Sequence, residues 1–395
     1  MATFLFTWEL GGGLGHVMPF RPVAERLIGK GHRVVAALRE LTHAERAFGD
    51  LPVEYLPAPF KSWRTEDRID PLLTFAHILH NTGWSSVNDL RTLMNAWRTI
   101  FDLIKPDVVI CDHSPTALLA LRGRGTKYVT FGTGFFAPPD ETPLPLFRMM
   151  ATNDLEKVRQ VETKVLQNAN ELLAKNGQPI LNRVTELYAD ADEEVLTTFA
   201  ELDHFPHRTD GYYVGRCPTE KGRPVIWPPG NGPKVFAYLK DFPAIVEVVK
   251  FLSEQRWPSV VVAPGLWLKL QPFAAPTILL AETPFDLQQV AREANLIIGN
   301  GNNGTVIEVL LSGKPVLSIP VTLDHSLFAD RVSQLGAGMT VAGNKPTDIT
   351  QAMIHMLQTD RYAQAAQRFE EKYASFNPAA ALDEVVGRLE RMAVK

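Results

Sequence analysis

The sequence predicts an α/β protein built from two doubly wound domains in tandem. Short runs of β-branched and aromatic residues alternate with longer segments whose apolar residues recur at helical spacing. Such alternation is typical of βαβ units and parallel sheets. It occurs twice, on either side of a segment rich in proline and glycine. A chain of 395 residues has room for two or three domains of roughly 150 residues.

The first half begins with a predicted strand at residues 2–8, followed by a glycine-rich turn and an amphipathic helix. Phe20, Val23, Ala24 and Leu27 share one face of this helix, and Gly31 ends it. Beyond it the pattern predicts strands at 33–38, 107–111 and 127–131, a helix at 87–104, and mostly helical sequence over 153–192.

Proline and glycine concentrate in residues 204–233, and we place the interdomain linker at 216–233. The first domain is then 1–215 and the second 234–395. Strands are predicted in the second domain at 234–239, 259–263, 277–280, 296–298 and 316–319. Residues 346–392 are helical, and the last helix can pack back on the first domain. Ligands of such folds bind at the carboxyl ends of strands, so we expect a site in a central crevice that the two domains face.

Composition excludes several classes of protein. The net charge is -4, whereas a protein that binds nucleic acid mainly through charge is normally basic. Cys111 and Cys217 are too few for a disulfide framework or a cysteine-rich zinc site. No apolar run approaches the ~18 residues of a membrane-spanning helix. The first residues carry no secretory signal, and a cytoplasmic location is the simplest expectation.

The first cluster with chemical potential is the turn at residues 11–19. Gly13 and Gly15 let backbone N–H groups approach an anion or a sugar closely. The spacing does not match the GxGxxG dinucleotide pattern, which disfavours an oxidoreductase. His16 lies where the next helix is expected to begin, a place from which it can act as a general base on a hydroxyl. The alternative is a histidine that only caps or packs in the turn.

The second cluster follows the strand at 107–111, where Asp112 is expected on the same sheet edge as His16. A carboxylate there can hold the imidazole in one tautomer and stabilise the imidazolium. The alternative is that Asp112 caps the helix that follows. A serine nucleophile is less favoured because no GxSxG elbow is present.

The third cluster joins the strand at 296–298 to a helix expected at 306–312. A glycine-rich turn before a helix N-terminus is a ready site for phosphate. Its candidate ligands are Asn300, Gly301, Asn302, Asn303, Gly304 and Thr305. Glu308, inside the helix, can accept two hydroxyl protons from a ribose. Alternatively, Thr305 and Glu308 form a capping box that serves the helix alone.

These residues resemble a known family. The GHVMP sequence at 15–19 is similar to the GHxxP motif of nucleotide-sugar-dependent glycosyltransferases with the two-domain GT-B fold. The segment 295–338 resembles the donor box of the same enzymes. The residues that match the donor box at aligned positions are Gly301, Gly304, Thr305, Glu308, Gly313, Pro315, Pro320, Asp324, Gly336 and Gly338. The resemblance is closest to the family-1 group of UDP-glycosyltransferases and macrolide glycosyltransferases.

The resemblance implies a role for each residue. His16 would be the catalytic base and Asp112 its partner, while Asp324 and His325 would bind the sugar. Departures from the box occur where Asn300 replaces a phosphate-binding histidine, Asn302 a glycine and His325 a glutamine. The usual Gly-Ser or Gly-Thr turn is also missing, and Lys240 stands there as a source of positive charge for the diphosphate.

From this we expect an inverting hexosyltransferase that moves a sugar from a nucleoside diphosphate, UDP or dTDP, to a hydroxyl of a small, rather apolar acceptor. The resemblance implies no metal and no other cofactor. We expect the acceptor near the aromatic-rich segments 75–97 and 131–147. Two alternatives stay open, a nucleotide-sugar epimerase and a catalytically inactive partner protein with the same fold. The sequence names neither the acceptor nor the oligomeric state.

Overall fold

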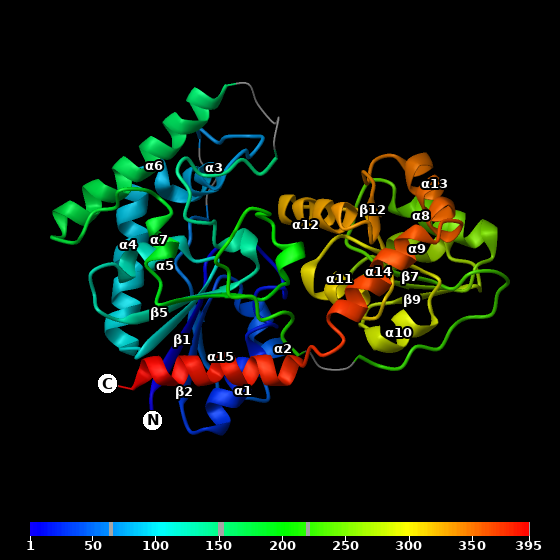
Figure 1. The fold of residues 1–395 in the computed structure, drawn as a ribbon, viewed down its shortest axis with the longest axis horizontal. Helices are drawn as coiled ribbons and strands as arrows, with labels where there is room; N and C mark the ends of the chain where they lie inside the picture. The colour runs from blue at the N-terminus through cyan, green and yellow to red at the C-terminus, as the bar shows by residue number, and fades with distance from the viewer. Residues whose placement is uncertain (63–65, 149–153, 219–221, 395) are drawn as a thin grey trace. The chain divides into compact units, whose positions relative to one another are not determined.

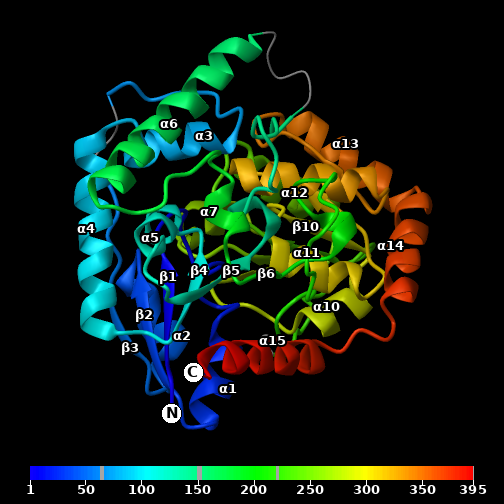
Figure 2. The same cartoon turned by 60° about the vertical axis from the view of Figure 1, so that its left-hand side comes forward.

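The computed structural model of the protein describes residues 1–62, 66–148, 154–218 and 222–394 (Figures 1 and 2). The chain divides into two compact units. The first comprises residues 1–200, 205–219 and 378–395, and the second comprises 201–204 and 220–377. Each unit is a six-stranded parallel sheet flanked by helices. This confirms the predicted class, a GT-B pair of Rossmann-like doubly wound domains.

The first sheet has the strand order β3-β2-β1-β4-β5-β6. Its strands are β1 (Thr3–Trp8), β2 (Arg33–Leu38), β3 (Glu54–Pro57), β4 (Val108–Asp112), β5 (Lys127–Gly132) and β6 (Glu193–Leu196). The central strands β1 and β4 pair in register so that Trp8 lies opposite Asp112. Residues that follow these two strands therefore emerge side by side at the carboxyl edge of the sheet.

The helices and short turns of the first unit cover both faces of this sheet. They are α1 (Arg21–Gly29), η1 (Leu41–His43), α2 (Ala44–Phe48), α3 (Phe75–Leu79), η2 (His80–Trp84), α4 (Val87–Ile104), α5 (Pro115–Leu121), η3 (Gly134–Phe136), α6 (Leu155–Lys175), α7 (Glu186–Ala189) and α15 (Pro378–Ala393). Of the residues expected on the apolar side of α1, Val23, Ala24 and Leu27 lie there, while Phe20 is the N-cap residue and enters the same core. Gly31 follows the helix at a φ of 82° that suits glycine.

Helix α15 joins the first unit although it lies at the other end of the chain. Figure 1 shows it, in red, beside α1 in blue. Leu382, Val385, Val386 and Leu389 enter the same core as Phe4, Phe6 and Trp8 of β1. Ion pairs from Arg26 to Asp383 and from Lys30 to Glu390, both 2.5 Å, line the contact. The first unit is thus built from both ends of the described chain.

The second sheet has the strand order β12-β11-β10-β7-β8-β9. Its strands are β7 (Val235–Tyr238), β8 (Ser259–Val262), β9 (Ile278–Ala281), β10 (Leu296–Gly299), β11 (Val316–Ser318) and β12 (Gly338–Thr340). Its helices and turns are α8 (Ile245–Gln255), α9 (Trp267–Leu270), η5 (Gln271–Phe273), α10 (Leu287–Glu293), α11 (Asn303–Leu310), α12 (Leu323–Gln334), α13 (Pro346–Leu357) and α14 (Arg361–Lys372). Another turn, η4 (Ala200–Leu202), lies where the chain passes between the units.

The expected linker also contributes to the second unit. Residues 222–227 run along α10, where the Asp286 amide donates to the Arg223 carbonyl and the Trp227 indole donates to Glu293. The helical stretch expected at 153–192 is two helices, α6 and α7, with an irregular segment between them, and residue 153 lies outside the described chain. Within the described chain, none of the helices combines the length and apolar character needed to cross a membrane.

Candidate active site

A histidine and an aspartate meet at the carboxyl edge of the first sheet. His16 Nδ1 lies 2.8 Å from Asp112 Oδ2, and the two side chains are 8 % and 3 % exposed. Asp112 is the last residue of β4, as the sequence indicated. His16 does not begin a helix, which corrects the expectation, because it sits in a turn five residues before α1 starts at Arg21.

The contact with His16 also decides what Asp112 does. Helix α5 begins after Ser114, and Asp112 makes no cap there, so the capping alternative for Asp112 is wrong. Burial raises the pKa of the Asp112 carboxyl, and His16 offsets part of this increase. An Asp that accepts from Nδ1–H leaves Nε2 as the basic atom of the ring.

Aromatic rings surround the His16 imidazole. Trp8 stacks on it at 5.0 Å and Phe136 packs at 4.7 Å, while His113 lies 6.0 Å away. The indole N–H of Trp8 donates to the Leu10 carbonyl at 2.7 Å, which fixes the ring that His16 stacks on. The imidazole plane is therefore set by packing as well as by its bond to Asp112.

Two glycines allow the pair to form. A Cβ on Gly11 would lie 2.4 Å from His16 Nε2, and φ there is 83°. A Cβ on Gly132 would lie 2.8 Å from Asp112 Oδ1, an oxygen that makes no hydrogen bond with any described residue. Gly13 and Gly15, which were predicted to let a ligand approach the backbone, have open space where a Cβ would stand, and their role stays a prediction.

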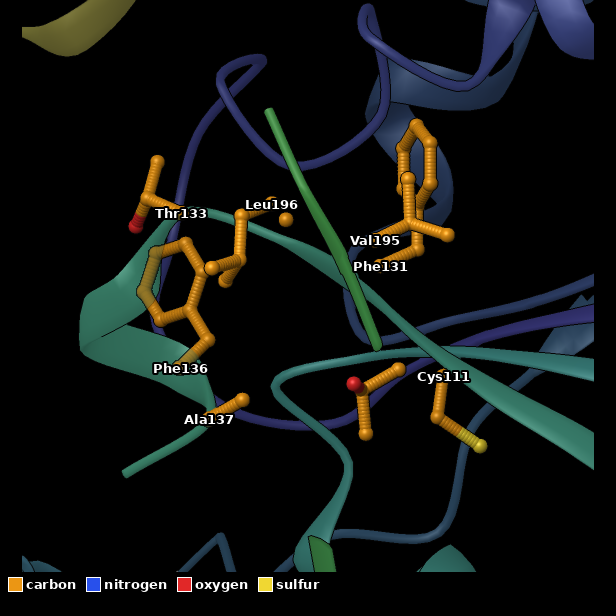
Figure 3. Close-up of a pocket in the computed structure, with 9 residues that line it drawn as sticks. Cys111, Phe131, Thr133, Phe136, Ala137, Val195 and Leu196 are labelled. Carbon is orange, nitrogen blue, oxygen red and sulfur yellow. The ribbon is translucent and has the colours of Figure 1, made fainter. Parts of the chain in front are cut away.

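Some of the aromatic residues expected near the acceptor lie around this pair, whereas Trp97 of the same predicted segments is buried against Phe101. Phe75, His113, Phe135 and Phe136 form consecutive ring contacts of 4.6–6.2 Å. The cavity beside them, drawn in Figure 3, is lined by residues of β4, β5, β6 and η3. Its volume of about 10 Å³ suits a water molecule and no larger ligand.

The second unit carries the predicted phosphate turn at the carboxyl ends of β7 and β10, which pair directly. Asn302 is the N-cap of α11, so the helix begins at Asn303 rather than at 306. Gly301 has a φ of 81°, and a Cβ there would lie 2.7 Å from the His325 carbonyl oxygen. Asn303, Gly304 and Thr305 form the first helical turn, where backbone N–H groups have no intrahelical acceptors.

This early start overturns the capping-box alternative for Glu308. Thr305 lies three residues inside α11, and its hydroxyl accepts from the Asn302 side chain at 2.7 Å. Glu308 is 7 % exposed and lies in the second turn of the helix. Its carboxylate therefore does not close a capping box with Thr305.

The Asn300 side chain bonds to backbone at both ends. Its Oδ1 accepts from the Lys240 amide at 2.6 Å, and its Nδ2 donates to the Ile319 carbonyl at 2.8 Å. Asn300 is 2 % exposed, and these bonds tie the ends of β7, β10 and β11 together. The Lys240 side chain is exposed at the same edge.

Asp324 and His325 begin α12 next to this turn. Burial lowers the pKa of His325, Asp324 raises it in part, and Lys240 lowers it further. Burial opposes ionisation of Asp324, but His325 and the Thr322 hydroxyl, 2.5 Å away, bring its pKa below the usual value. The pair is thus an ionised carboxylate beside a neutral imidazole, whose Nδ1 has no hydrogen-bond partner among the described residues. In the described ranges, no group of His, Cys, Asp and Glu is placed to hold a metal ion.

Comparison with known proteins supports the class inferred from the sequence. No family model matches the chain. A PGL/p-HBAD biosynthesis rhamnosyltransferase of Mycobacterium bovis is 20 % identical over 308 residues, which are 73 % of this chain and 68 % of the relative. The calicheamicin glycosyltransferase CalG4 superimposes with a TM-score of 0.71 at 19 % identity, covering 99 % of this chain and 98 % of that one.

The spinosyn rhamnosyltransferase SpnG, solved with thymidine diphosphate, superimposes with a TM-score of 0.69 at 15 % identity. The match covers 98 % of this chain and all of SpnG, which has also been solved with spinosyn aglycone. These likenesses extend through both units. The solved structures confirm the GT-B fold, and the curated relatives bear out the expected glycosyltransferase class.

Proposed function

We propose that the protein is an inverting glycosyltransferase that moves a sugar from UDP or dTDP to a hydroxyl of a small, rather apolar acceptor. The observation that carries this proposal is the buried His16–Asp112 pair at 2.8 Å. A neutral imidazole held through Nδ1 presents Nε2 as a general base. The SpnG structures with thymidine diphosphate and with an aglycone support the donor and acceptor classes by analogy.

In the proposed reaction, His16 Nε2 takes the proton of the acceptor hydroxyl as its oxygen bonds to the anomeric carbon. The bond from that carbon to the diphosphate breaks, and the diphosphate leaves with the electron pair. A single displacement of this kind inverts the anomeric configuration. Asp112 keeps the Nδ1 proton in place and stabilises the imidazolium that forms.

The donor would bind in the second unit. The first turn of α11 offers backbone N–H groups and a positive helix end to the diphosphate, where negative charge grows as it leaves. Lys240 would add positive charge, so the proposed step needs no metal. Glu308 would accept hydrogen bonds from the ribose. Asp324 and neutral His325 would bind sugar hydroxyls, and His325 Nδ1 has unused hydrogen-bonding capacity for this.

The acceptor would bind on the first unit beside the aromatic rings near His16. The cavity of about 10 Å³ in Figure 3 is too small for an acceptor, so the hydroxyl must reach Nε2 from elsewhere. Flat apolar rings favour acceptors with an extended apolar body.

A panel of UDP- and dTDP-sugars, each with and without apolar alcohols and phenols, tests this function. We expect nucleoside diphosphate to be released only when an acceptor is present, and an NMR spectrum of the product to show the anomeric configuration opposite to that of the donor. A new sugar nucleotide formed from donor alone would identify an epimerase. Absence of any thermal shift with UDP, dTDP or GDP would identify an inactive partner protein.

A further inference from the structure

One buried carboxylate in the first unit takes no part in the proposed reaction. Glu9 follows β1 directly and is 1 % exposed. Trp8, the residue before it, stacks on His16, whereas the side chain of Glu9 reaches the start of α5. Glu9 therefore lies between the strand that leads to His16 and the helix that follows Asp112.

Hydrogen bonds tie these two segments together around Glu9. Its Oε2 accepts from the Thr116 amide at 2.9 Å and from the Ala117 amide at 3.3 Å, both in the first turn of α5. The next residue, Leu10, donates its amide to the His113 carbonyl at 3.0 Å. His113 has a φ of 43°, a conformation that a non-glycine residue adopts only where its surroundings enforce it.

The carboxylate is kept in unfavourable surroundings. Burial raises the pKa of Glu9 to about 7, and the Thr116 side chain, the two amides and the Trp97 side chain offset only part of the increase. The titratable groups that face it are Cys111 of β4 and Tyr188 of α7, while Arg39 donates to its backbone carbonyl. A leucine would fill this apolar site without a buried charge, so the structure gives Glu9 no packing advantage.

We propose that Glu9 is a positioning residue, whose carboxylate holds the turn carrying Asp112 and His113 against the loop carrying His16. The proposal rests on the function proposed above for the His16–Asp112 pair. A shift of a few tenths of an ångström at α5 would move Asp112 away from His16 Nδ1, and general base catalysis depends on that geometry.

Two variants separate the acceptor atom from the charge. Glu9→Leu removes the acceptor of the Thr116 and Ala117 amides, while Glu9→Gln keeps an oxygen acceptor without the charge. The matched control is Asp107→Leu, which likewise removes the side-chain acceptor of a backbone amide. Asp107 Oδ2 accepts from the Thr3 amide at 2.9 Å and so ties β1 to β4 at their opposite, amino ends.

We expect Glu9→Leu to lower kcat by about 10- to 100-fold, with KM for the sugar nucleotide nearly unchanged. Glu9→Gln should recover most of the lost kcat, and Asp107→Leu should leave kcat as in the wild type. Joined to His16→Ala, Glu9→Leu should cause no further loss, because it acts through that pair. Wild-type kcat in Glu9→Leu, or an equal loss in Asp107→Leu, would overturn the proposal.

Two further measurements keep the inference separate from the proposed function. Hydrogen exchange of the Thr116 and Ala117 amides should accelerate in Glu9→Leu and not in Glu9→Gln. Unchanged exchange in Glu9→Leu would show that Glu9 does not hold these two amides. If His16→Ala itself retained full turnover, the proposed base would be wrong, while these amides would still report on Glu9.

The pH dependence of stability gives a signature that loss of packing would not produce. Because the pKa of Glu9 is raised on folding, the wild-type protein loses stability as pH rises from about 4.5 to about 7. We therefore compare the melting temperature of Glu9→Gln with that of the wild type at each pH. The difference in favour of the variant should be larger at pH 8 than at pH 5, while the kcat of the variant does not exceed that of the wild type. A difference that stays constant with pH would contradict the assignment.

Discussion

The imidazole of His16 has one nitrogen occupied and one available. Asp112 takes Nδ1 at 2.8 Å, while Trp8 and Phe136 hold the ring plane. Rotation of the ring would break the bond and disturb both stacking contacts, so the geometry selects Nε2 as the reacting atom.

His16→Ala should lower turnover by roughly 10²- to 10⁴-fold, the usual contribution of general base catalysis. Nucleotide affinity should remain nearly as in the wild type, because most of the predicted donor residues lie in the other unit. Steady-state kinetics and calorimetry on the same preparations check this, and near-wild-type turnover in the variant would remove His16 from the mechanism.

Asn300 supports two interpretations, as a phosphate ligand and as a tie between strand ends. Its bonds to Lys240 and Ile319 mean that Asn300→Ala leaves one buried and one partly buried backbone group without these partners. We expect a stability loss of about 1–3 kcal/mol, measured by denaturant unfolding.

Calorimetric titration then separates the two roles of Asn300. The proposed phosphate contact requires UDP or dTDP to bind Asn300→Ala and Asn300→Gly more weakly by ~1–3 kcal/mol, and Asn300→His to bind more tightly at low pH. In the wild type, binding through this position should not titrate near pH ~6–7, since an amide carries no proton there. Equal affinities in all four proteins would show that the phosphate lies elsewhere.

At the scale of elements, the start of α11 determines what its side chains can do. Because the helix begins at Asn303, Glu308 lies buried in its second turn and cannot belong to a capping box with Thr305. Glu308→Ala should therefore weaken nucleotide binding by about 1.5–3 kcal/mol through lost hydrogen bonds to a charged group. It should not show the stability loss of ~1 kcal/mol that follows removal of a cap. Melting temperature and affinity measured on one preparation decide this, and a stability loss at unchanged affinity would exclude a ribose contact.

The strands that the sequence did not predict are edge strands. β3 and β6 close the two sides of the first sheet, and β12 closes one side of the second. β3 is mostly exposed, β6 begins with two glutamates, and β12 has only three residues. Strands paired on one side only need no continuous apolar run, so hydrophobic pattern identifies central strands such as β2 and β4 far better.

The same limit applies to the candidate site. Motif spacing pointed to His16 and Asp112, which lie at the ends of adjacent central strands. Gly11, Gly132 and Glu9 were missed because their meaning depends on atoms far away in the chain. A glutamate directly after an apolar strand was the available signal, because a charged residue that is buried at such a position needs a specific partner.

For the whole molecule, the division into two cores means that stability is not one quantity. The apolar face of α15 belongs to the first core, whereas α8 and α13 belong to the second. Leu389 on α15 is 2 % exposed, and Leu389→Ala should lower the free energy of unfolding of the first unit by about 2–5 kcal/mol. Only the unfolding transition of the first unit should move to lower temperature. The transition of the second unit is identified as the one that shifts when nucleotide is added. A shift of the nucleotide-sensitive transition alone would contradict this arrangement.

The return of α15 to the first unit sets the order in which the chain can fold during synthesis. A ribosome makes residues 1–200 first, and these contain all the strands of the first sheet but not the helix that covers Phe4 and Phe6. The whole of the second unit emerges before residues 378–393 do. During synthesis of the second unit, the apolar surface that α15 later covers is therefore exposed on the nascent first unit. In that interval the exposed surface can bind chaperones or lead to aggregation.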